Sequence, residues 1–418
     1  MVADHTARCR AALIGRAGAR FLDRDDPLRR EAEERLPPTA GLSAGMARAV
    51  IDGMARDWTE QRLLAMLAAE LHDPAALDRF VNSPGVPGGL RVRSYAPSLS
   101  LHLGASTVPG VSATSLVRAL LIGSSALVKP GRADVVLPVL FTRALAEVAP
   151  ELAAMAAVVY WEGGTSAAEQ AALDEADAVV VYGGDETIRA VRTRVRAATR
   201  LVLYHHRISA AVLGREAFAA GGLEDVAETC ARAVAMFDQR GCVSPHAFFV
   251  EEGGAVSPQG FAAALAAALD VLESVLPAAK VTPAEGAWLQ QLRSTAELRA
   301  AAGEAVEVFS APGTAWTVVL EPAAVPEPCV ARSVRVHPVR EAWEACTHLA
   351  PLGAHLQTVG LAGLQPIHRE LLAAGLGEIG AVRICALSEV PFPPPWWHHD
   401  GQGPLAPLLR WVDLEGPP

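Results

Sequence analysis

The feature that most restricts the fold is a regular alternation of short apolar segments and helical segments between residues 90 and 204. The expected strands are 100–103, 126–128, 158–161, 178–182 and 201–204, and the expected helices are 111–122, 133–148, 167–173 and 186–198. Strands that alternate with helices form a parallel sheet covered by helices on both faces. The sequence therefore predicts an α/β fold whose ligands bind beyond the carboxyl ends of the strands.

A second α/β unit is expected from about Asp225 onward. Its strands are predicted near 247–250, 316–321, 333–337 and 355–359, with helices around 259–276 and 340–348. The N-terminal stretch is mostly helical in pattern, because residue types that cap helices precede runs of helical periodicity. We therefore predict four parts: a helical N-terminal region at 1–89, an α/β domain at 90–224, a second α/β domain at 225–380 and a tail at 381–418 that packs back on the body.

Composition limits the classes of partner and of site. The chain has 418 residues, of which 51% are hydrophobic, enough to bury the cores of two or three domains. The formal charge of −10 argues against nucleic acid as a main partner, because phosphate backbones are bound by clustered Lys and Arg. No secretory segment and no run of roughly 18 apolar residues occurs, so we expect a cytoplasmic protein without a membrane span. The six cysteines lack metal-finger spacing, and we expect reduced thiols and no metal.

The sequence around Cys242 has the features of a nucleophile site. An apolar helical pattern runs from about Asp225 to Phe237, after which Gly241 frees the backbone to turn and Pro245 prevents a helix from continuing. Cys242 is therefore predicted to lie on a bend, where a thiol and backbone N–H groups can form a nucleophile and an oxyanion site together. The alternative is a small buried side chain, since free cysteines are often buried.

Two strand ends in the first α/β unit carry residues suited to a bound anion. Lys129 follows one predicted strand and would project into the ligand crevice, although a lysine in this place is often only a solvated charge. Gly183 and Gly184 follow another strand, allow close approach of a ligand, and open a helix start that contains Thr187. Glycines at such turns also serve the turn alone, so neither motif is specific by itself.

Together, the three motifs resemble those of the aldehyde dehydrogenase superfamily, in which a strand-end Lys-Pro, a Gly-containing turn and a Gly-x-Cys loop occur in this order. The chain is still more similar to the acyl-CoA reductase family, which includes the LuxC-like fatty acid reductase linked to bacterial luciferase. This resemblance extends from about residue 30 to residue 415. The blocks that carry it are Leu36-Pro-Pro-Thr-Ala-Gly-Leu-Ser43, His102-Leu-Gly-Ala-Ser-Thr-Val-Pro109, Gly241-Cys-Val-Ser-Pro245, Leu356-Gln-Thr-Val-Gly360 and Gly380-Ala-Val-Arg-Ile-Cys385. It implies an aldehyde dehydrogenase-like fold, with a Rossmann-type cofactor domain at 90–224 and the catalytic domain at 225–380.

The resemblance also implies a reaction at Cys242. The thiolate would attack an acyl thioester of CoA or of an acyl carrier protein, release the carrier thiol and leave an acyl-enzyme. Hydride from a reduced nicotinamide would then give a thiohemiacetal that collapses to an aldehyde. Only about a few per cent of an ordinary cysteine is ionised at neutral pH, so we expect a lowered pKa or a nearby base. The candidate bases are His246, His206 and His205, and the alternative for each is a structural or solvated histidine.

Two departures from the wider superfamily bear on this chemistry. Hydrolytic members activate water with a glutamate in a segment that here reads Leu203-Tyr-His-His-Arg-Ile208 and lacks a carboxylate. Loss of a positioned base removes something like 10²–10⁴-fold from water attack, which favours reduction over hydrolysis. The usual asparagine of the oxyanion loop is replaced by Ser106-Thr107, so Thr107 is the expected side-chain donor beside the N–H of Cys242. Removing one such donor costs roughly 3–4 kcal/mol of transition-state stabilisation.

Arg132 determines the expected cofactor. Relatives that prefer NAD often carry a glutamate at this place, which bonds the ribose and repels a 2′-phosphate. A guanidinium pairs with phosphate through two hydrogen bonds, so we expect NADPH (NADP+), bound by Lys129, Arg132, Gly183, Gly184 and Thr187. The alternative is a solvated surface arginine. The resemblance further implies a homo-oligomer formed by strand exchange.

The sequence leaves three functions open. The first is an NADPH-dependent acyl-thioester reductase that forms an aldehyde, with CoA-dependent aldehyde oxidation as its reverse. The second is an acyltransferase or thioesterase-like protein in which Cys242 carries acyl groups without hydride transfer. The third is a non-catalytic scaffold of the same fold, which the Thr107 departure would allow.

Overall fold

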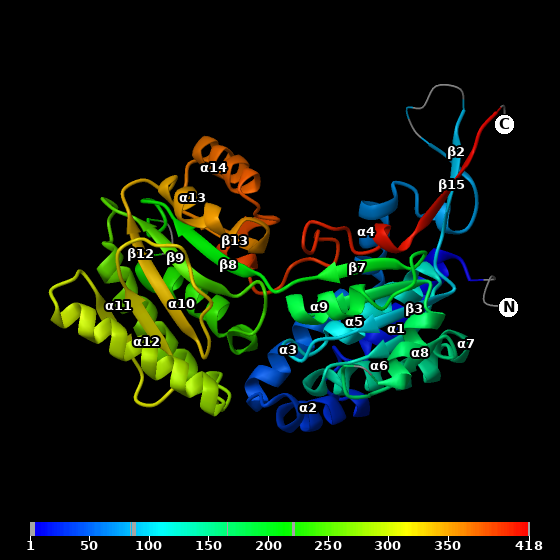
Figure 1. Ribbon diagram of the computed structural model, residues 1–418, viewed down its shortest axis with the longest axis horizontal. Helices are drawn as coiled ribbons and strands as arrows, with labels where there is room; N and C mark the ends of the chain where they lie inside the picture. Colours follow the sequence, from blue (N-terminus) through cyan, green and yellow to red (C-terminus); the bar gives the residue numbers. More distant parts are fainter. Residues whose placement is uncertain (1–4, 84, 86–88, 165, 220–221, 417–418) are drawn as a thin grey trace. The chain divides into compact units, whose positions relative to one another are not determined.

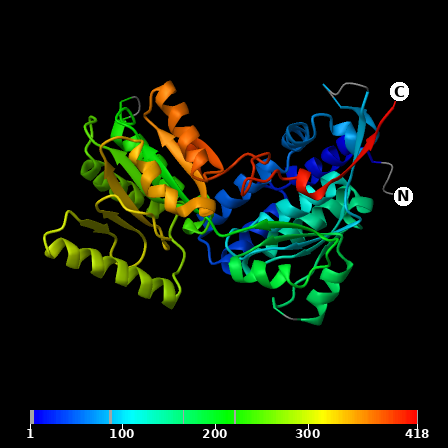
Figure 2. The ribbon, with the colours of Figure 1, turned by 45° about the horizontal axis from the view of Figure 1, so that its top comes forward.

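The structure, a computed structural model, contains two compact units, each made from more than one stretch of the chain. The residues it describes are 5–83, 85, 89–164, 166–219 and 222–416. The first unit comprises Met1–Ala40, Ala47–His205 and Pro394–Pro418, and the second comprises Gly41–Met46 and His206–Pro393. In each unit, helices pack on both faces of a sheet (Figure 1, Figure 2).

The first unit is built on a five-stranded parallel sheet with the strand order β5-β4-β3-β6-β7. Its strands are β3 (Leu99–Leu103), β4 (Ser125–Lys129), β5 (Ala156–Val158), β6 (Ala178–Tyr182) and β7 (Arg200–Tyr204). The helices between them are α5 (Val111–Ile122), η2 (Arg132–Asp134), α6 (Val136–Val148), α7 (Pro150–Ala153), α8 (Ala167–Glu175) and α9 (Asp185–Arg192). The predicted alternation is confirmed. The strand order reverses between β3 and β6, and such a switch point is where nucleotides bind in open α/β sheets.

Successive residues of these strands point to opposite faces, so different helices cover the two faces of the sheet. Leu101 and Val179 pack with Leu173 of α8 and Ile188 of α9 in one buried cluster. The neighbouring His102 points to the other face. The sheet is therefore buried on both sides, which explains its nearly continuous apolar strands.

Helices precede this sheet, as the sequence predicts: α1 (Ala7–Ala19), α2 (Pro27–Ala40), α3 (Ala44–Asp57), α4 (Glu60–Leu71) and the short η1 (Pro74–Leu77). Helix α1 packs against α4, α5 and α6. The buried Trp58 makes edge contacts with Phe21 at 5.6 Å and Phe141 at 5.2 Å between ring centroids. These aromatic contacts join the N-terminal helices to α6 in one core.

The second unit is built on a seven-stranded sheet with the order β10-β11-β12-β9-β8-β13-β14, in which only β10 is antiparallel to its neighbour. Its strands are β8 (Ile208–Leu213), β9 (Pro245–Glu251), β10 (Glu307–Ser310), β11 (Thr317–Leu320), β12 (Ser333–Val339), β13 (Leu356–Ala362) and β14 (Arg383–Ala386). Its helices are α10 (Gly222–Ala235), η3 (Met236–Gln239), α11 (Pro258–Val275), α12 (Pro283–Ala301), α13 (Glu344–Leu349), η4 (Ala350–His355), α14 (Pro366–Glu378) and η5 (Leu387–Glu389). The predicted strands β9, β11, β12 and β13 are confirmed, whereas β8, β10, β14, α12 and α14 were not predicted.

Strand β9 illustrates how this second sheet is enclosed. Phe248 contacts Phe261 of α11 at 5.7 Å between ring centroids, and the next residue, Phe249, stacks on His348 of α13 at 5.9 Å. Adjacent residues of one strand therefore bury their rings under different helices. Seven consecutive buried residues in β9 follow from this double cover.

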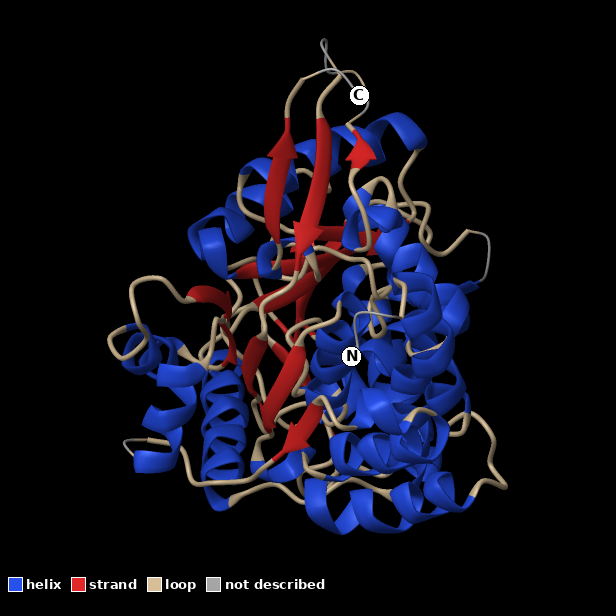
Figure 3. Ribbon diagram, turned by 90° about the vertical axis from the view of Figure 1, so that its right-hand side faces the viewer, coloured by secondary structure: helices blue, strands red, loops and turns tan. Residues whose placement is uncertain are grey.

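A small antiparallel sheet brings the end of the chain back to the first unit. Its order is β1-β2-β15, formed by β1 (Val81–Asn82), β2 (Arg91–Tyr95) and β15 (Arg410–Leu414), with η6 (Ala406–Leu408) just before the last strand. Figure 3 draws the strands of the structure in red. Glu70 of α4 accepts hydrogen bonds from the N–H groups of Leu405 (3.2 Å) and Ala406 (3.0 Å), which attaches the C-terminal segment to the helices. Among the described residues, none of the helices combines the length and the apolarity that a bilayer crossing requires.

Candidate active site

The segment before Cys242 has an unusual backbone. Helix α10 ends at Ala235, earlier than the sequence pattern predicts, because Phe237, Asp238 and Gln239 have positive φ angles of 56°, 51° and 62°. All three side chains are buried. A left-handed conformation costs roughly 1–2 kcal/mol for each residue other than glycine, so surrounding contacts must stabilise this turn.

Buried polar side chains stabilise the left-handed turn. The Asp238 carboxylate accepts hydrogen bonds from Arg332 Nε (3.0 Å) and Nη2 (2.6 Å). Arg332 is 1% exposed and also donates to Glu273 at 3.0 Å. The amide of Gln239 donates to the carbonyl of Pro245 at 3.1 Å, on the far side of Cys242. The loop that carries Cys242 is therefore closed at its base.

Cys242 itself lies on a turn at the start of β9, so the predicted bend is confirmed. The N–H of Ser244 donates to the carbonyl of Gly241 at 3.0 Å. Ser209 of β8 donates its hydroxyl to the carbonyl of Cys242 (2.7 Å) and accepts from the N–H of Thr358 of β13 (3.0 Å). The thiol is half-buried. It is therefore held where the parallel strands of the second sheet begin, which we call the amino edge.

The amino edge brings together three sequence blocks that are far apart in the chain. Gln357 of β13 donates from its amide nitrogen to the sulfur of Cys242 at 3.5 Å. Arg383, the first residue of β14, pairs in register with Thr358. Burial lowers the pKa of Arg383, whereas the thiols of Cys385 and Cys242 raise it. The charge of the guanidinium therefore interacts with both sulfur atoms. Gln357 and Arg383 lie in two of the sequence blocks that carry the resemblance, but the sequence suggested no chemical role for either.

The histidines proposed as bases lie in different surroundings. His246 is 4% exposed in β9, and its Nδ1 accepts the backbone N–H of Cys329 at 2.8 Å. Burial, with a smaller effect from His206, lowers the pKa of His246 to about 4, so the ring is neutral at pH 7. Its proton is then on Nε2, which favours a structural role over general base catalysis. His206 is exposed, and His205 belongs to the first unit, where its ring is 3.3 Å from Asp185.

The residues predicted to bind the cofactor gather in the first unit. Lys129 ends β4, Arg132 opens η2, Gly183 and Gly184 follow β6, and Thr187 lies in the first turn of α9. Because the strands are parallel, these positions share one edge of the sheet, which we call the carboxyl edge. Gly184 precedes α9 without a side-chain cap and has open space where a Cβ would stand. The carboxyl edge therefore offers room and backbone N–H groups to a ligand.

Arg132 has neighbours that the sequence analysis missed. Its side chain is 80% exposed and lies 3.3 Å from the carboxylate of Glu162, which is 82% exposed. A hydrogen bond to Tyr160 raises the pKa of Arg132. Lys129 Nζ is 5.7 Å from the centre of the same tyrosine ring. Tyr160 and Glu162 follow β5, and their place after a parallel strand was the available signal.

Thr107, the predicted oxyanion donor, is exposed in the loop between β3 and α5. This loop touches the turn after β4, since a Cβ on Gly131 would lie 2.4 Å from the carbonyl carbon of Ala105. The N–H of Gly104 also donates to the carbonyl of Lys129 at 2.8 Å. Thr107 therefore belongs to the carboxyl edge of the first unit, whereas Cys242 belongs to the second unit.

Carboxyl groups lie at both helix starts of the carboxyl edge. At α5, the buried carboxylate of Asp134 accepts the N–H groups of Gly110 (2.5 Å) and Ser112 (2.7 Å), and burial raises its pKa to about 7. At α9, the first turn carries Asp185 and Glu186. Their charges oppose an anion, so this turn suits a ribose or nicotinamide group better than the phosphate expected from its glycines.

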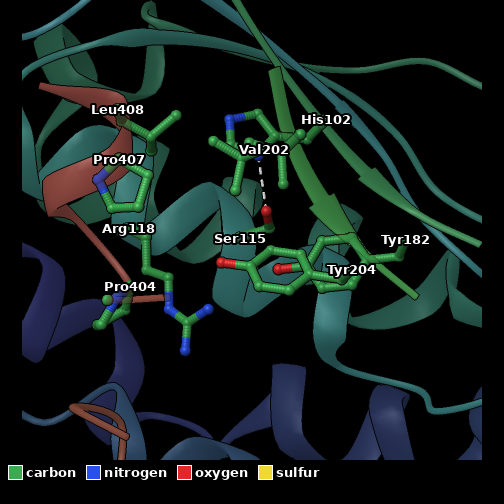
Figure 4. A pocket seen from close by; sticks show the side chains of 11 residues that line it. His102, Ser115, Arg118, Tyr182, Val202, Tyr204, Pro404, Pro407 and Leu408 are labelled. Atoms are coloured by element: carbon green, nitrogen blue, oxygen red, sulfur yellow. Dashed lines mark hydrogen bonds between the residues drawn. The ribbon is translucent and has the colours of Figure 1, made fainter. Parts of the chain in front are cut away.

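A row of stacked aromatic rings begins at Tyr182, the residue before the turn at Gly183. Tyr182 stacks on Tyr204 at 4.6 Å, Tyr204 on His399 at 4.4 Å, and His399 on Trp397 at 4.6 Å, all between ring centroids. Beside them is a cavity of about 10 Å³, room for roughly one water molecule. Figure 4 shows its lining, including His102, Ser115, Arg118, Tyr182, Tyr204 and Leu408. Trp397 of the C-terminal segment therefore packs at the end of this row of stacked rings.

The described part of the chain contains no group of three or more His, Cys, Asp or Glu side chains arranged to hold a metal ion. All six cysteines are described and none forms a disulfide. The candidate nucleophile remains the thiol of Cys242, with the amide nitrogen of Gln357 at 3.5 Å from its sulfur.

Comparisons with known proteins identify the family. The family model described as Acyl-CoA reductase (LuxC) matches residues 11–411. A search of curated proteins gives no match.

Solved structures share the fold. An oxidoreductase from Marinobacter aquaeolei has a TM-score of 0.74 at 14% identity, covering 98% of this chain and 86% of its own. An NAD-dependent benzaldehyde dehydrogenase from Corynebacterium glutamicum has a TM-score of 0.70 at 16% identity, covering 99% and 87%. An NADP-dependent glyceraldehyde-3-phosphate dehydrogenase from Bacillus halodurans has a TM-score of 0.70 at 13% identity, covering 99% and 88%. The predicted aldehyde dehydrogenase-like fold is confirmed, and the match over residues 11–411 shows that the chain belongs to the acyl-CoA reductase (LuxC) family.

Proposed function

We propose that the protein reduces an acyl thioester, carried on CoA or on an acyl carrier protein, to an aldehyde with NADPH. The observation that carries this proposal is the half-buried thiol of Cys242, which is held on a closed turn with the amide of Gln357 3.5 Å from its sulfur. A donor beside the sulfur stabilises the thiolate, the form that attacks carbonyl carbon.

The proposed reaction begins at Cys242. Its thiolate forms a bond to the thioester carbonyl carbon, and the backbone N–H of Cys242 donates to the oxyanion. Collapse of the oxyanion breaks the bond to the carrier sulfur, which leaves as a thiolate and takes a proton from solvent. The acyl group remains on Cys242 as a thioester.

Water attack on this acyl-enzyme lacks a catalyst in the segment where hydrolytic relatives carry one. Residues 203–208 span the end of β7 and the start of β8 and contain no carboxylate. Without a positioned base, hydrolysis slows by roughly 10²–10⁴-fold. The acyl-enzyme therefore persists until it is reduced.

The carboxyl edge of the first unit fits a dinucleotide. The switch point between β3 and β6 and the open Gly184 are typical of a nucleotide site. Lys129 would contact the ribose or phosphates, and Arg132 would pair with a 2′-phosphate once it leaves Glu162. When bound, NADPH supplies the hydride that reduces the acyl carbon. The resulting thiohemiacetal on Cys242 loses its hydroxyl proton and expels the thiolate as the aldehyde forms.

A direct assay tests the proposed function. The enzyme is mixed with acyl-CoAs and acyl carrier proteins of several chain lengths, and NADPH oxidation and aldehyde formation are measured together. We expect one aldehyde for each NADPH consumed. Acylation of Cys242 without NADPH consumption for any thioester would instead indicate an acyltransferase or thioesterase-like protein. A protein that neither accepts an acyl group nor oxidises NADPH would be a scaffold.

A further inference from the structure

Arg383 is a buried cation beside the reactive thiol. It is 9% exposed, and two of its hydrogen bonds go to neutral backbone carbonyls, those of Val390 (3.1 Å) and Glu389 (2.6 Å). The groups that act on its charge include the thiols of Cys385 and Cys242 and the Glu389 carboxylate, which belongs to an exposed residue. A guanidinium stays protonated in proteins, and its positive charge stabilises a nearby anion.

We propose that Arg383 and Gln357 together stabilise Cys242 as a thiolate, the guanidinium through its charge and the amide through its hydrogen bond to the sulfur. This inference rests on the proposed function only in taking Cys242 as the nucleophile. It assigns the activation of the thiol to a fixed cation and amide on β14 and β13 instead of to a histidine base.

The placement of Gln357 supports this assignment. Its amide nitrogen is 3.5 Å from the sulfur of Cys242, within reach of an N–H···S hydrogen bond. Gln357 is 0% exposed and follows the first residue of β13, where the neighbouring Thr358 bonds Ser209 and Ser209 bonds the carbonyl of Cys242. The first residues of β13 therefore position both the amide of Gln357 and the sulfur of Cys242. The amide can donate a hydrogen bond to a thiolate with little rearrangement.

The placement of Arg383 supports it independently. Arg383 pairs in register with Thr358, so its strand lies directly beside the one that carries Gln357. Cys385, two residues further along β14, shares its face of the sheet. Burial raises the pKa of the Cys385 thiol, whereas Arg383 lowers it, which shows the sign of the effect that the guanidinium has on a thiol.

The contrast with His246 strengthens the inference. Its Nδ1 already accepts the N–H of Cys329, and its ring is neutral at pH 7. The Nδ1 atom of His246 is therefore already occupied and is not available to accept the thiol proton of Cys242. In the proposed scheme the thiol proton passes to solvent before substrate binds, and the fixed positive charge of Arg383 keeps the sulfur ionised.

The test follows alkylation of Cys242 by iodoacetamide as a function of pH. Cleavage after Arg240 and Lys280 releases the peptide 241–280, which contains a single cysteine, so mass spectrometry reports Cys242 alone. For Arg383→Met we expect the pH midpoint of alkylation to rise by about one unit and the rate at pH 7 to fall about tenfold. Arg383→Lys should restore most of the rate. Gln357→Leu should lower the rate by roughly tenfold or more, since one hydrogen bond to a charged group is lost.

Controls separate this inference from the proposed function. Arg369→Met removes an exposed positive charge from α14 and should leave the midpoint unchanged. If Arg383→Met does not fold, the Gln357→Leu and Arg383→Lys results decide. Folded variants of Gln357 or Arg383 that alkylate with the wild-type midpoint would overturn the inference. A wild-type protein that alkylates as expected but accepts no acyl group from any thioester would overturn the proposed function instead.

Discussion

The two large sheets present their candidate sites at opposite edges. In the first unit, Lys129 and Gly183 follow strands, and the candidate cofactor site lies at the carboxyl edge. In the second unit, Cys242 precedes β9, while Gln357 and Arg383 stand at the starts of β13 and β14, so the candidate nucleophile lies at the amino edge.

This difference distinguishes a site that any parallel α/β sheet provides from one that depends on particular side-chain contacts. At the carboxyl edge of any parallel α/β sheet, βα turns and helix starts supply room and N–H groups to a ligand. The amino edge of a parallel sheet lacks these βα turns and helix starts. There, the chain places Cys242 through a left-handed turn held by Gln239 and by the buried pair of Asp238 and Arg332. The first edge is predicted to bind and the second to react.

The largest effect should come from removing the thiol. Cys242→Ala leaves the carboxyl edge untouched, so NADPH binding should stay at the wild-type affinity while turnover falls by about 10⁴-fold or more, as for other lost nucleophiles. Fluorescence titration measures the first quantity and NADPH oxidation the second. Cys385→Ala is the matched control and should keep turnover. A parallel loss of binding and turnover in Cys242→Ala would break the division between the edges.

The next effect concerns the stability of the Cys242 loop. Asp238→Ala removes the carboxylate that pairs with the buried Arg332. Because a buried charge then loses its partner, we expect the free energy of unfolding to fall by roughly 3 kcal/mol. Urea denaturation measures this change. Asp25→Ala, which breaks the exposed pair with Arg30, is the control and should cost under about 1 kcal/mol. Equal costs for both variants would mean that the buried pair does not hold the turn.

Cofactor choice tests the carboxyl edge. Arg132→Glu should weaken NADPH by about 10- to 100-fold and NADH far less, because a carboxylate repels the 2′-phosphate that the guanidinium would pair with. Glu162→Gln should strengthen NADPH severalfold, since its carboxylate now holds Arg132 at 3.3 Å. Equilibrium titration with both cofactors gives the ratios. Equal losses for NADPH and NADH in Arg132→Glu would remove the phosphate argument.

The smallest effect on turnover is expected at His246. His246→Asn keeps an acceptor for the N–H of Cys329, so turnover should stay close to wild type, whereas loss of a general base would cost roughly 10²–10⁴-fold. The variant should nevertheless change acid stability. Because burial lowers the pKa of His246 to about 4, the wild type has this stabilisation above pH 6.5 and loses roughly 3 kcal/mol as pH falls to 4. Thermal melts from pH 7 to pH 4 should show a shallower decline for the variant.

The sequence predicted the first unit better than the second. Helix α5 matches its prediction residue for residue, and four strands of the first sheet lie where they were predicted, whereas β5 covers 156–158 and was predicted at 158–161. The alternation of strand and helix is local, so the periodicity of one segment is enough to find it. The same locality made Cys242, Lys129 and Gly183 visible as motifs.

The missed features depend on contacts between distant segments. Strand β8 follows β7 after only three residues, 205–207, and that short interval reads as one continuous segment. Gln357 and Arg383 acquire a role only because β13 and β14 bring them to Cys242, which is more than a hundred residues away in sequence. A glutamine and an arginine carry no pattern that predicts a sulfur as their partner.

The central claim is that Cys242 holds an acyl group until hydride arrives. The most direct measurement incubates the enzyme with acyl-CoA in the absence of NADPH and determines the mass of the peptide 241–280, which contains Cys242 as its single cysteine. We predict one acyl group on this peptide, stable in buffer and discharged as aldehyde when NADPH is added. An unmodified peptide, or an acyl group lost at the same rate with and without NADPH, would contradict the account.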